Sequence, residues 1–129
     1  YTATKLTVVD RNRAFIGGAI MPGVMIALDA LAQKAAQLPP ISLQVQNIKP
    51  IGTNTIDCMQ SGAILGAASM IDGMVERYRQ IVGQDATVVA CGGIVEFILP
   101  HCKQSIVQDR NLLLDGLKAL YDKNISSAI

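Results

Sequence analysis

Alternating apolar and polar positions mark the start of the chain. Residues 4–9 (TKLTVV) alternate in this way, residues 10–13 (DRNR) are polar, and residues 14–16 (AFI) begin a second apolar stretch. A period of two residues is typical of a half-buried strand, so these segments predict a β-hairpin. Gly17-Gly18 interrupts the second strand, and glycine inside a strand indicates a bulge or a close approach of another backbone.

Two longer segments repeat their apolar residues at helical spacing, which predicts helices over residues 23–37 and 55–82. Thr55 is a candidate N-cap for the second helix, and Asp57 would lie near its positive end. The middle of this helix is rich in small residues: Ser61, Gly62, Ala63, Gly66, Ala67, Ala68 and Ser69. Such a surface either packs on the domain's own sheet or forms a helix–helix interface with a second domain or subunit.

The rest of the chain alternates short strand and helix patterns: an edge strand at 41–45, a strand at 86–90, a helix at 94–99, a strand at 105–107 and a helix at 110–123. Antiparallel strands followed by strands alternating with helices predict an α/β fold with a mixed sheet covered by helices. No repeat or linker divides residues 1–129, so we expect a single domain. Ligands of such sheets bind beyond the carboxyl ends of strands, and the turn after Ala90 is such an end.

Composition narrows the classes of function. Half of the 129 residues are apolar and the net charge is +1, which indicates an ordinary globular domain. Without a basic stripe, and with only 4% aromatic residues, the chain has no footprint for nucleic acid. No apolar run approaches the length of a membrane span, and the first residues do not resemble a signal peptide. Tyr1 in place of an initiator Met suggests a processed chain, a trimmed chain or a fragment.

The three cysteines, Cys58, Cys91 and Cys102, are odd in number and share no C-x-x-C spacing. We therefore expect reduced thiols in a cytoplasmic protein. His101 beside Cys102 is a poor start for a zinc site, which needs four clustered ligands.

Several short motifs then follow one another in a fixed order. They are Thr2-Ala3-Thr4, GGAIMPG at 17–23, Leu38-Pro39, IGTNT at 51–55 with QSG at 60–62, and Cys91-Gly92-Gly93. Each motif alone is weak, but together they resemble the type III pantothenate kinases over nearly the whole chain. That family belongs to the superfamily of actin, Hsp70 and sugar kinases.

The resemblance implies a ribonuclease-H-like (actin-like ATPase) domain, with a mixed sheet and helices on both faces. Members of the family carry two such domains with ATP in the cleft between them, and residues 1–129 would be the second, C-terminal one. They are ATP:pantothenate phosphotransferases of coenzyme A biosynthesis. They are typically homodimers and use magnesium with a monovalent cation, potassium or ammonium. The partners implied are pantothenate, the missing N-terminal domain and a second copy of the chain, with self-association through helix 55–82.

Site residues follow from the same resemblance. Thr2 would offer its hydroxyl and N–H to a nucleotide phosphate, and Gly92 and Gly93 would let the backbone approach adenosine. Thr55 would contact pantothenate. Two plainer interpretations stay open, an ordinary N-cap for Thr55 and a tight turn for Gly92-Gly93.

Departures from the family pattern limit what this chain can do alone. Tyr1 occupies a family glycine position, and the Asp expected before it, a cation ligand, lies off the chain. Lys5, Thr7 and Cys91 also replace usual family residues. The first phosphate loop and the catalytic base belong to the absent half, so no catalytic residue and no metal ligand are assigned, and the lone chain should be inactive. The alternatives are a non-catalytic homologue acting as a dimerisation or regulatory module, or another kinase of the superfamily.

Overall fold

The predicted hairpin is present in the computed structural model, which describes residues 3–35 and 37–128. Strands β1 (Ala3–Val9) and β2 (Phe15–Pro22) pair antiparallel. Between them, a carboxylate oxygen of Asp10 accepts hydrogen bonds from the N–H groups of Asn12 and Ala14, at 2.8 and 2.9 Å. An Asp that bonds the backbone two residues on closes turns in this way.

The Gly17-Gly18 pair has both consequences that the sequence predicted. The pairing register shifts between Val8 and Val9, which places a bulge beside Gly17. A Cβ atom on Gly18 would lie 1.8 Å from the carbonyl oxygen of Leu6 on the neighbouring strand. Any side chain at that position would therefore force the two strands apart.

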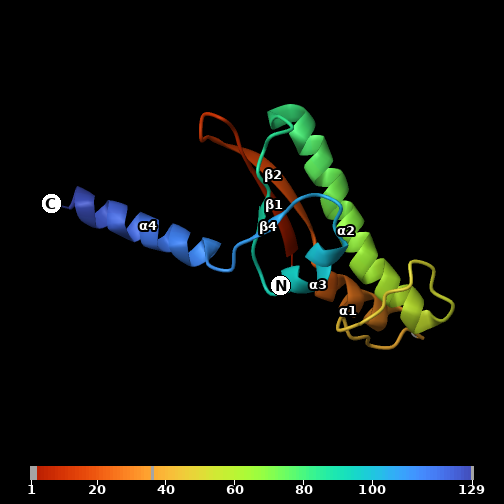
Figure 1. Cartoon of the computed structure of the whole chain (residues 1–129). Coiled ribbons are helices and arrows are strands. Elements are labelled where there is room, and N and C mark those ends of the chain that lie inside the picture. The colour runs from red at the N-terminus through yellow and green to blue at the C-terminus, as the bar shows by residue number, and fades with distance from the viewer. Residues whose placement is uncertain (1–2, 36, 129) are drawn as a thin grey trace.

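Two helices follow, α1 (Val24–Lys34) and α2 (Thr55–Val82), and α2 runs beside the hairpin (Figure 1). The bounds of α2 match the predicted 55–82, whereas α1 ends at Lys34 and not at residue 37. Gly83 ends α2 at φ 116°, a left-handed conformation that favours glycine.

The edge strand predicted at 41–45 is wrong, because this segment is a loop. The N–H of Val45 bonds back to the carbonyl oxygen of Leu43 at 3.0 Å, a local turn in place of a strand ladder. The carbonyl of Ser42 accepts the side-chain amide of Gln60 at 3.2 Å. Leu43 itself is buried in the core, so its apolar character serves packing in a loop.

The C-terminal part of the chain contains short elements and one long helix. They are β3 (Val89–Ala90), α3 (Val95–Ile98), the 3₁₀ helix η1 (Leu99–His101), β4 (Val107–Gln108) and α4 (Leu112–Ser127). Each predicted strand and helix is present here, but the strands are shorter than the ranges 86–90 and 105–107. The last helix begins and ends later than the predicted 110–123.

The mixture of helices and small sheets confirms an α/β fold, but the single mixed sheet was not found. Within the described residues, β1 pairs only with β2, antiparallel, and β3 pairs only with β4, parallel. The second ladder is two residues long, and it is not hydrogen-bonded to the free edge of β1. The helices also do not cover two faces of one sheet, since α4 projects away from the body (Figure 1).

The core lies where α2 meets α1, α3 and the 41–48 loop. Its buried residues are Val24, Leu28, Leu43, Ile64, Ala67, Ala68 and Ile98. Ala67 and Ala68 show that some small residues of α2 pack against their own domain. By contrast, Cβ atoms on Gly62, Gly66 and Gly73 would meet nothing within 4 Å. Packing on the domain itself is thus confirmed for Ala67 and Ala68, and the helix–helix interface stays a prediction for the exposed Gly62 and Gly66.

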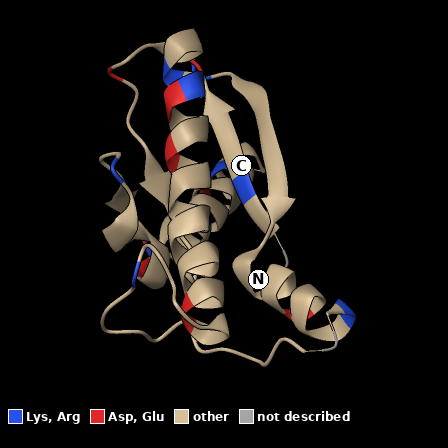
Figure 2. Ribbon diagram, turned by 90° about the vertical axis from the view of Figure 1, so that its right-hand side faces the viewer, with Lys and Arg blue, Asp and Glu red and all other residues tan. Residues whose placement is uncertain are grey.

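Charged side chains of α2 lie in its first turn and its C-terminal part, so the middle is uncharged (Figure 2). Asp72 accepts the backbone N–H groups of Lys103 and Gln104 at 2.7 and 3.0 Å. Arg79 donates to the carbonyl of Ala86 at 3.1 Å. These bonds attach the β3 and β4 region to α2. No helix in 3–35 or 37–128 is both long and apolar enough to cross a membrane.

Candidate functional site

The start of α2 is capped by Asn54, so the prediction that Thr55 is the N-cap is wrong. Asn54 has extended backbone, φ −142° and ψ 168°, and its side chain accepts the N–H of Asp57 at 2.9 Å. Asp57 lies in the positive first turn, as predicted, and also accepts the ammonium of Lys49 at 2.7 Å. Thr55 is the first helical residue and is exposed, and its hydroxyl bonds to no described residue.

The other residues of this signature hold the preceding loop against α2. A Cβ atom on Gly52 would lie 2.4 Å from the backbone nitrogen of Cys58, so only glycine allows this approach. Ser61 donates its hydroxyl to the carbonyl of Pro50 at 2.9 Å, and Gln60 donates to the carbonyl of Ser42. Sequence reasoning noted these residues as a motif but did not foresee that they anchor the 42–54 loop. These contacts position Thr55 at the start of α2, where its hydroxyl bonds to no described residue.

The Gly92-Gly93 turn follows β3 directly and is exposed. Gly92 is at φ 120°, and a Cβ atom there would meet only Val95 Cγ2, at 3.9 Å. Open space in front of the backbone is what a close ligand approach needs. The same positive φ also fits the plainer interpretation, a tight turn.

Both glycines line a cavity of about 840 Å³ between β1, α2 and the 86–95 segment. Ala3 and Thr4 line the same cavity from the first strand. Thr2, the predicted phosphate contact, lies outside the described residues, but it directly precedes these two. The structure therefore brings Ala3 and Thr4 of the first motif and the Cys91-Gly92-Gly93 motif to one cavity.

The charge of this lining has one sign. Among its described residues only Lys5 and Arg79 are charged, and both are cationic. The guanidinium Nε of Arg79 is buried without a hydrogen-bond partner. A cationic lining favours an anion over a cation, although the Arg79 guanidinium already donates to Gln104 Oε1 and to the carbonyl of Ala86. No group of three His, Cys, Asp or Glu side chains gathers in the described part of the chain.

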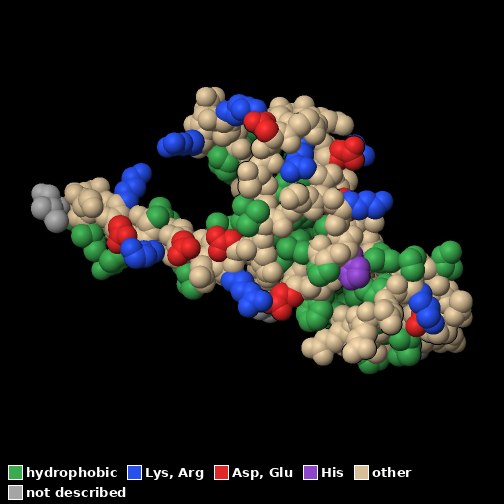
Figure 3. Space-filling model, in the orientation of Figure 1, with side chains coloured by type: hydrophobic (Ala, Val, Ile, Leu, Met, Phe, Trp, Pro, Cys, Tyr) green, Lys and Arg blue, Asp and Glu red, His purple; other side chains and the backbone are tan. Residues whose placement is uncertain are grey.

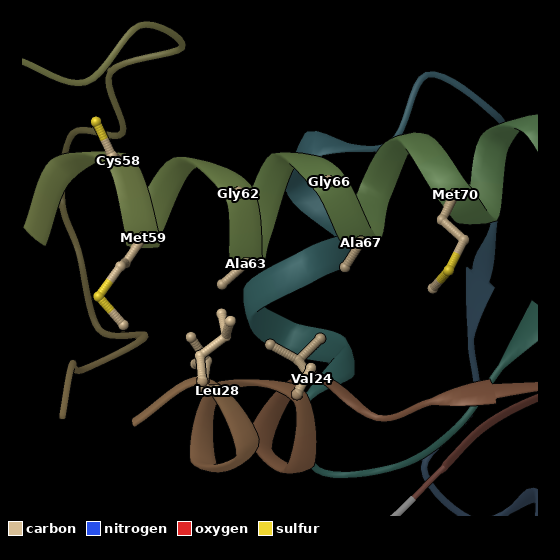
Figure 4. Close-up of a pocket in the computed structure, with 11 residues that line it drawn as sticks. Val24, Leu28, Cys58, Met59, Gly62, Ala63, Gly66, Ala67 and Met70 are labelled. Atoms are coloured by element: carbon tan, nitrogen blue, oxygen red, sulfur yellow. The ribbon is translucent and has the colours of Figure 1, made fainter. Parts of the chain in front are cut away.

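A smaller cavity of about 410 Å³ separates α1 from α2 (Figure 4). Val24 and Leu28 point from α1 toward Ala63 and Ala67 of α2, and Gly62 and Gly66 leave space along the helix. The lining is almost wholly apolar. Thr55 lines neither cavity, so the structure does not place it with Gly92 and Gly93.

The two cavities are nevertheless neighbours. Val24 and Ala67 line both of them. At its other end the smaller cavity reaches Cys58 and Met59, three and four positions after Thr55, the spacing that puts residues on one helix face. The apolar lining thus comes within one helical turn of Thr55, which itself lines neither cavity.

Two of the cysteines line the cavities, Cys58 the smaller one and Cys91 the larger one. Cys58 and Cys91 are exposed, free thiols. Burial raises the pKa of the Cys102 thiol above its ordinary value, and the nearby Asp72 carboxylate raises it further. Cys102 is therefore a protonated, structural thiol beneath the loop that Asp72 holds.

These features define a class of protein: an α/β domain whose anion-favouring cavity opens at a strand end. Comparison with known proteins gives the family. The family model for type III pantothenate kinase matches residues 2–77. The chain belongs to the type III pantothenate kinase family.

Curated relatives agree with the family model. The type III pantothenate kinase of Frankia alni is 40% identical over 124 residues, which are 96% of this chain and 49% of that protein. The Roseiflexus castenholzii enzyme of the same name is 43% identical over 123 residues, 95% of this chain and 48% of the relative. The chain thus spans about half the length of the curated relatives it matches, and that half is their C-terminal one.

A solved structure shares the fold. The chain from Campylobacter jejuni, described as a Baf family transcriptional activator, superposes with a TM-score of 0.70 at 18% identity. The match covers 97% of this chain and 55% of that chain. At 18% identity this match supports only the arrangement of the helices and strands.

Substitutions at Asn54 and Thr55 should show that Asn54 alone caps α2. Asn54→Ala should lower the free energy of unfolding by about 1 kcal/mol, because the N–H of Asp57 loses its acceptor. Thr55→Ala, the matched control, should change it by less than about 0.5 kcal/mol. Urea denaturation followed by circular dichroism measures both. Equal losses for the two variants would show that Thr55 is also part of the cap.

Proposed function

We propose that this chain is the C-terminal domain of a two-domain kinase that phosphorylates pantothenate with ATP, the first step of coenzyme A biosynthesis. The observation that carries the proposal is the shared cavity. Ala3-Thr4 and Gly92-Gly93 are distant in sequence, yet they line one cavity whose charged residues are cationic. Family membership supports the chemistry, and the βαβ order after the hairpin supports a ribonuclease-H-like domain.

ATP would lie against the larger cavity. Gly92 and Gly93 would pass close to adenosine, and Thr2 would donate to a phosphate beside Ala3 and Thr4. Phosphoryl transfer depends mainly on positioning and on neutralising charge, and this wall supplies donors and cations for that purpose. The described residues offer no cluster of acidic ligands. Magnesium and the monovalent cation, potassium or ammonium, would therefore be held elsewhere in the two-domain protein, as would the catalytic base.

Pantothenate would meet the start of α2. The free hydroxyl of Thr55 is one donor there, and the first N–H groups of a helix favour a carboxylate. Asn54 already satisfies the N–H of Asp57, so the capping role does not compete with binding by Thr55. The apolar surface from Cys58 to Val24 would guide the rest of the molecule toward the ATP cavity.

The exposed glycines of α2 support a homodimer. Gly62 and Gly66 are exposed, and added Cβ atoms would meet nothing within 4 Å. Residues this small let two helices approach closely, although Gly62 and Gly66 also line the edge of the cavity between α1 and α2. The alternative of a non-catalytic module has no observation of its own in its favour, and the curated relatives are named as kinases.

The kinase proposal predicts distinct effects at the two ends of the surface. The chain alone should show no turnover in a coupled ATP assay, whereas the chain joined behind the N-terminal half of the Frankia alni relative should phosphorylate pantothenate. In that fusion, Thr55→Ala should raise KM for pantothenate about three- to tenfold, the cost of one hydrogen bond. KM for ATP should stay unchanged.

Two further variants complete this test. Gly92→Val should raise KM for ATP and leave KM for pantothenate unchanged, because the added side chain fills the space before the turn. Thr53→Ala, at an exposed threonine of the loop two positions before Thr55, should change neither constant. Ordinary turnover by the lone chain, or an active fusion indifferent to both site variants, would refute the assignment.

Self-association through α2 makes a separate prediction. Light scattering should give about twice the 13.7 kDa mass of one chain. Gly66→Leu should give a folded monomer, because the single chain has room for the side chain and a close helix pair does not. Gln84→Leu adds the same side chain outside α2 and should leave the dimer intact. A wild-type monomer would refute the dimer, and a Gly66→Leu dimer would place the contact elsewhere.

A further inference from the structure

Helix α4 carries an apolar stripe that no described residue covers. None of its residues is buried, and its large side chains face solvent: Leu113 is 70% exposed, Leu117 55%, Leu120 60% and Tyr121 64%. Leu117 follows Leu113 by four positions, and Leu120 and Tyr121 follow Leu117 by three and four, which puts all four on one face of the helix. Figure 3 shows hydrophobic side chains along the projecting helix, separated from the hairpin by an open notch.

The other face of α4 is adapted to water. Lys118 pairs with Asp122 at 2.8 Å, one turn apart, and Asp115 and Lys123 are exposed as well. Leu114 and Ile125, one turn from Lys118 and Asp122, are exposed apolar residues at the border of this side, and Ala119 is a small apolar residue within it. Isolated helices of this length are marginally stable in water, and an amphipathic helix gains its stability from the surface it packs on. We therefore expect another surface to pack on the stripe of Leu113, Leu117, Leu120 and Tyr121.

The chain's own body is a poor candidate for that partner. Its core is closed by α1, α2, α3 and the 41–48 loop, with no contribution from α4. Only the root of the helix, Leu112 and Leu113, reaches the body, where it lines the larger cavity. The remaining turns extend away from it (Figure 1).

Comparison with related chains indicates which polypeptide would cover the apolar stripe of α4. The Campylobacter jejuni structure matches 97% of this chain, so most of α4 is included, but the match covers only 55% of that chain. The Frankia alni relative likewise continues over about as many residues again. The fold that includes α4 thus belongs to chains with a second half, and that half is the polypeptide whose length and position suit the uncovered stripe.

We propose that the apolar stripe of α4 is the docking surface for the N-terminal domain of the same protein. The inference rests on the two-domain organisation of the proposed function. It adds a consequence for the site, because Leu112 and Leu113 line the cavity that Gly92 and Gly93 also line. A domain bound to α4 would lie next to the opening of that cavity. It could then form the second wall of the ATP cleft expected between the two domains.

Hydrogen exchange tests the docking without reference to catalysis. The chain alone, at dilute concentration, should exchange the amides of Leu112–Ser127 quickly and those of α2 slowly. Joining the N-terminal half of the Frankia alni relative before residue 1 should slow exchange in α4 by about 100-fold or more, because packing converts a fraying helix into a protected one.

A matched pair of variants shows whether the stripe is responsible. In the fusion, Leu117→Asp should restore fast exchange in α4 while α2 stays protected. Ala119→Asp puts the same charge on the opposite face and should keep the protection. As a second measurement, the same N-terminal half, added as a separate polypeptide, should bind the chain in calorimetry, and Leu117→Asp should weaken that binding at least tenfold while Ala119→Asp does not.

Three results would overturn the inference. Protection of α4 in the dilute chain alone would mean that it folds back on its own body. Protection that grows with the concentration of the lone chain would assign the stripe to a second copy. An unprotected α4 in the fusion, together with binding indifferent to Leu117→Asp, would leave the stripe without the proposed partner. A fusion with protected α4 but no turnover would instead defeat the kinase proposal alone.

Discussion

The packing of α2 on α1 is the contact on which the rest of the structure depends. Ile64, Ala67 and Ala68 bury one side of α2, and Val24 and Leu28 meet them from α1. Burial of this kind is the main favourable term in folding. Because α2 is fixed, its polar side chains can hold distant segments: Asp72 and Arg79 secure the β3 and β4 region, and Gln60 and Ser61 secure the loop before the helix.

The same helix connects the two predicted ligand contacts. Its first turn presents Thr55, and its middle forms a wall of both cavities, the larger of which contains Gly92 and Gly93. Several residues that mark the family by sequence have a positional role here, since Gly52 and Asn54 shape the entry of the chain into α2. A site built this way places ligand contacts on a rigid element and keeps structural and binding roles on neighbouring residues.

The local sequence pattern predicted the structure correctly where that structure depends mainly on the segment's own residues. Twenty-eight residues of helical period fixed the ends of α2, and alternation with Gly17-Gly18 fixed the hairpin and its bulge. The local pattern gave wrong predictions where contacts with other parts of the chain determine the structure. Residues 41–45 look like a strand but bury Leu43 from a loop, and the cap fell to Asn54 because its backbone, not that of Thr55, is extended. The meeting of Ala3-Thr4 with Gly92-Gly93 and the exposure of the apolar face of α4 depend on the tertiary fold, which local pattern does not reveal.

The account is tested most directly by a nuclear magnetic resonance titration of the ¹⁵N-labelled protein, joined to the N-terminal half of the Frankia alni relative, with ATP and then pantothenate. We expect ATP to shift the amides of Ala3, Thr4, Gly92 and Gly93 most, and pantothenate to shift Thr55 and its first helical turn. If ATP instead perturbs only residues far from the glycine turn, or pantothenate leaves Thr55 unmoved, the cavity beside β3 is not the nucleotide wall and the shared surface along α2 has another use.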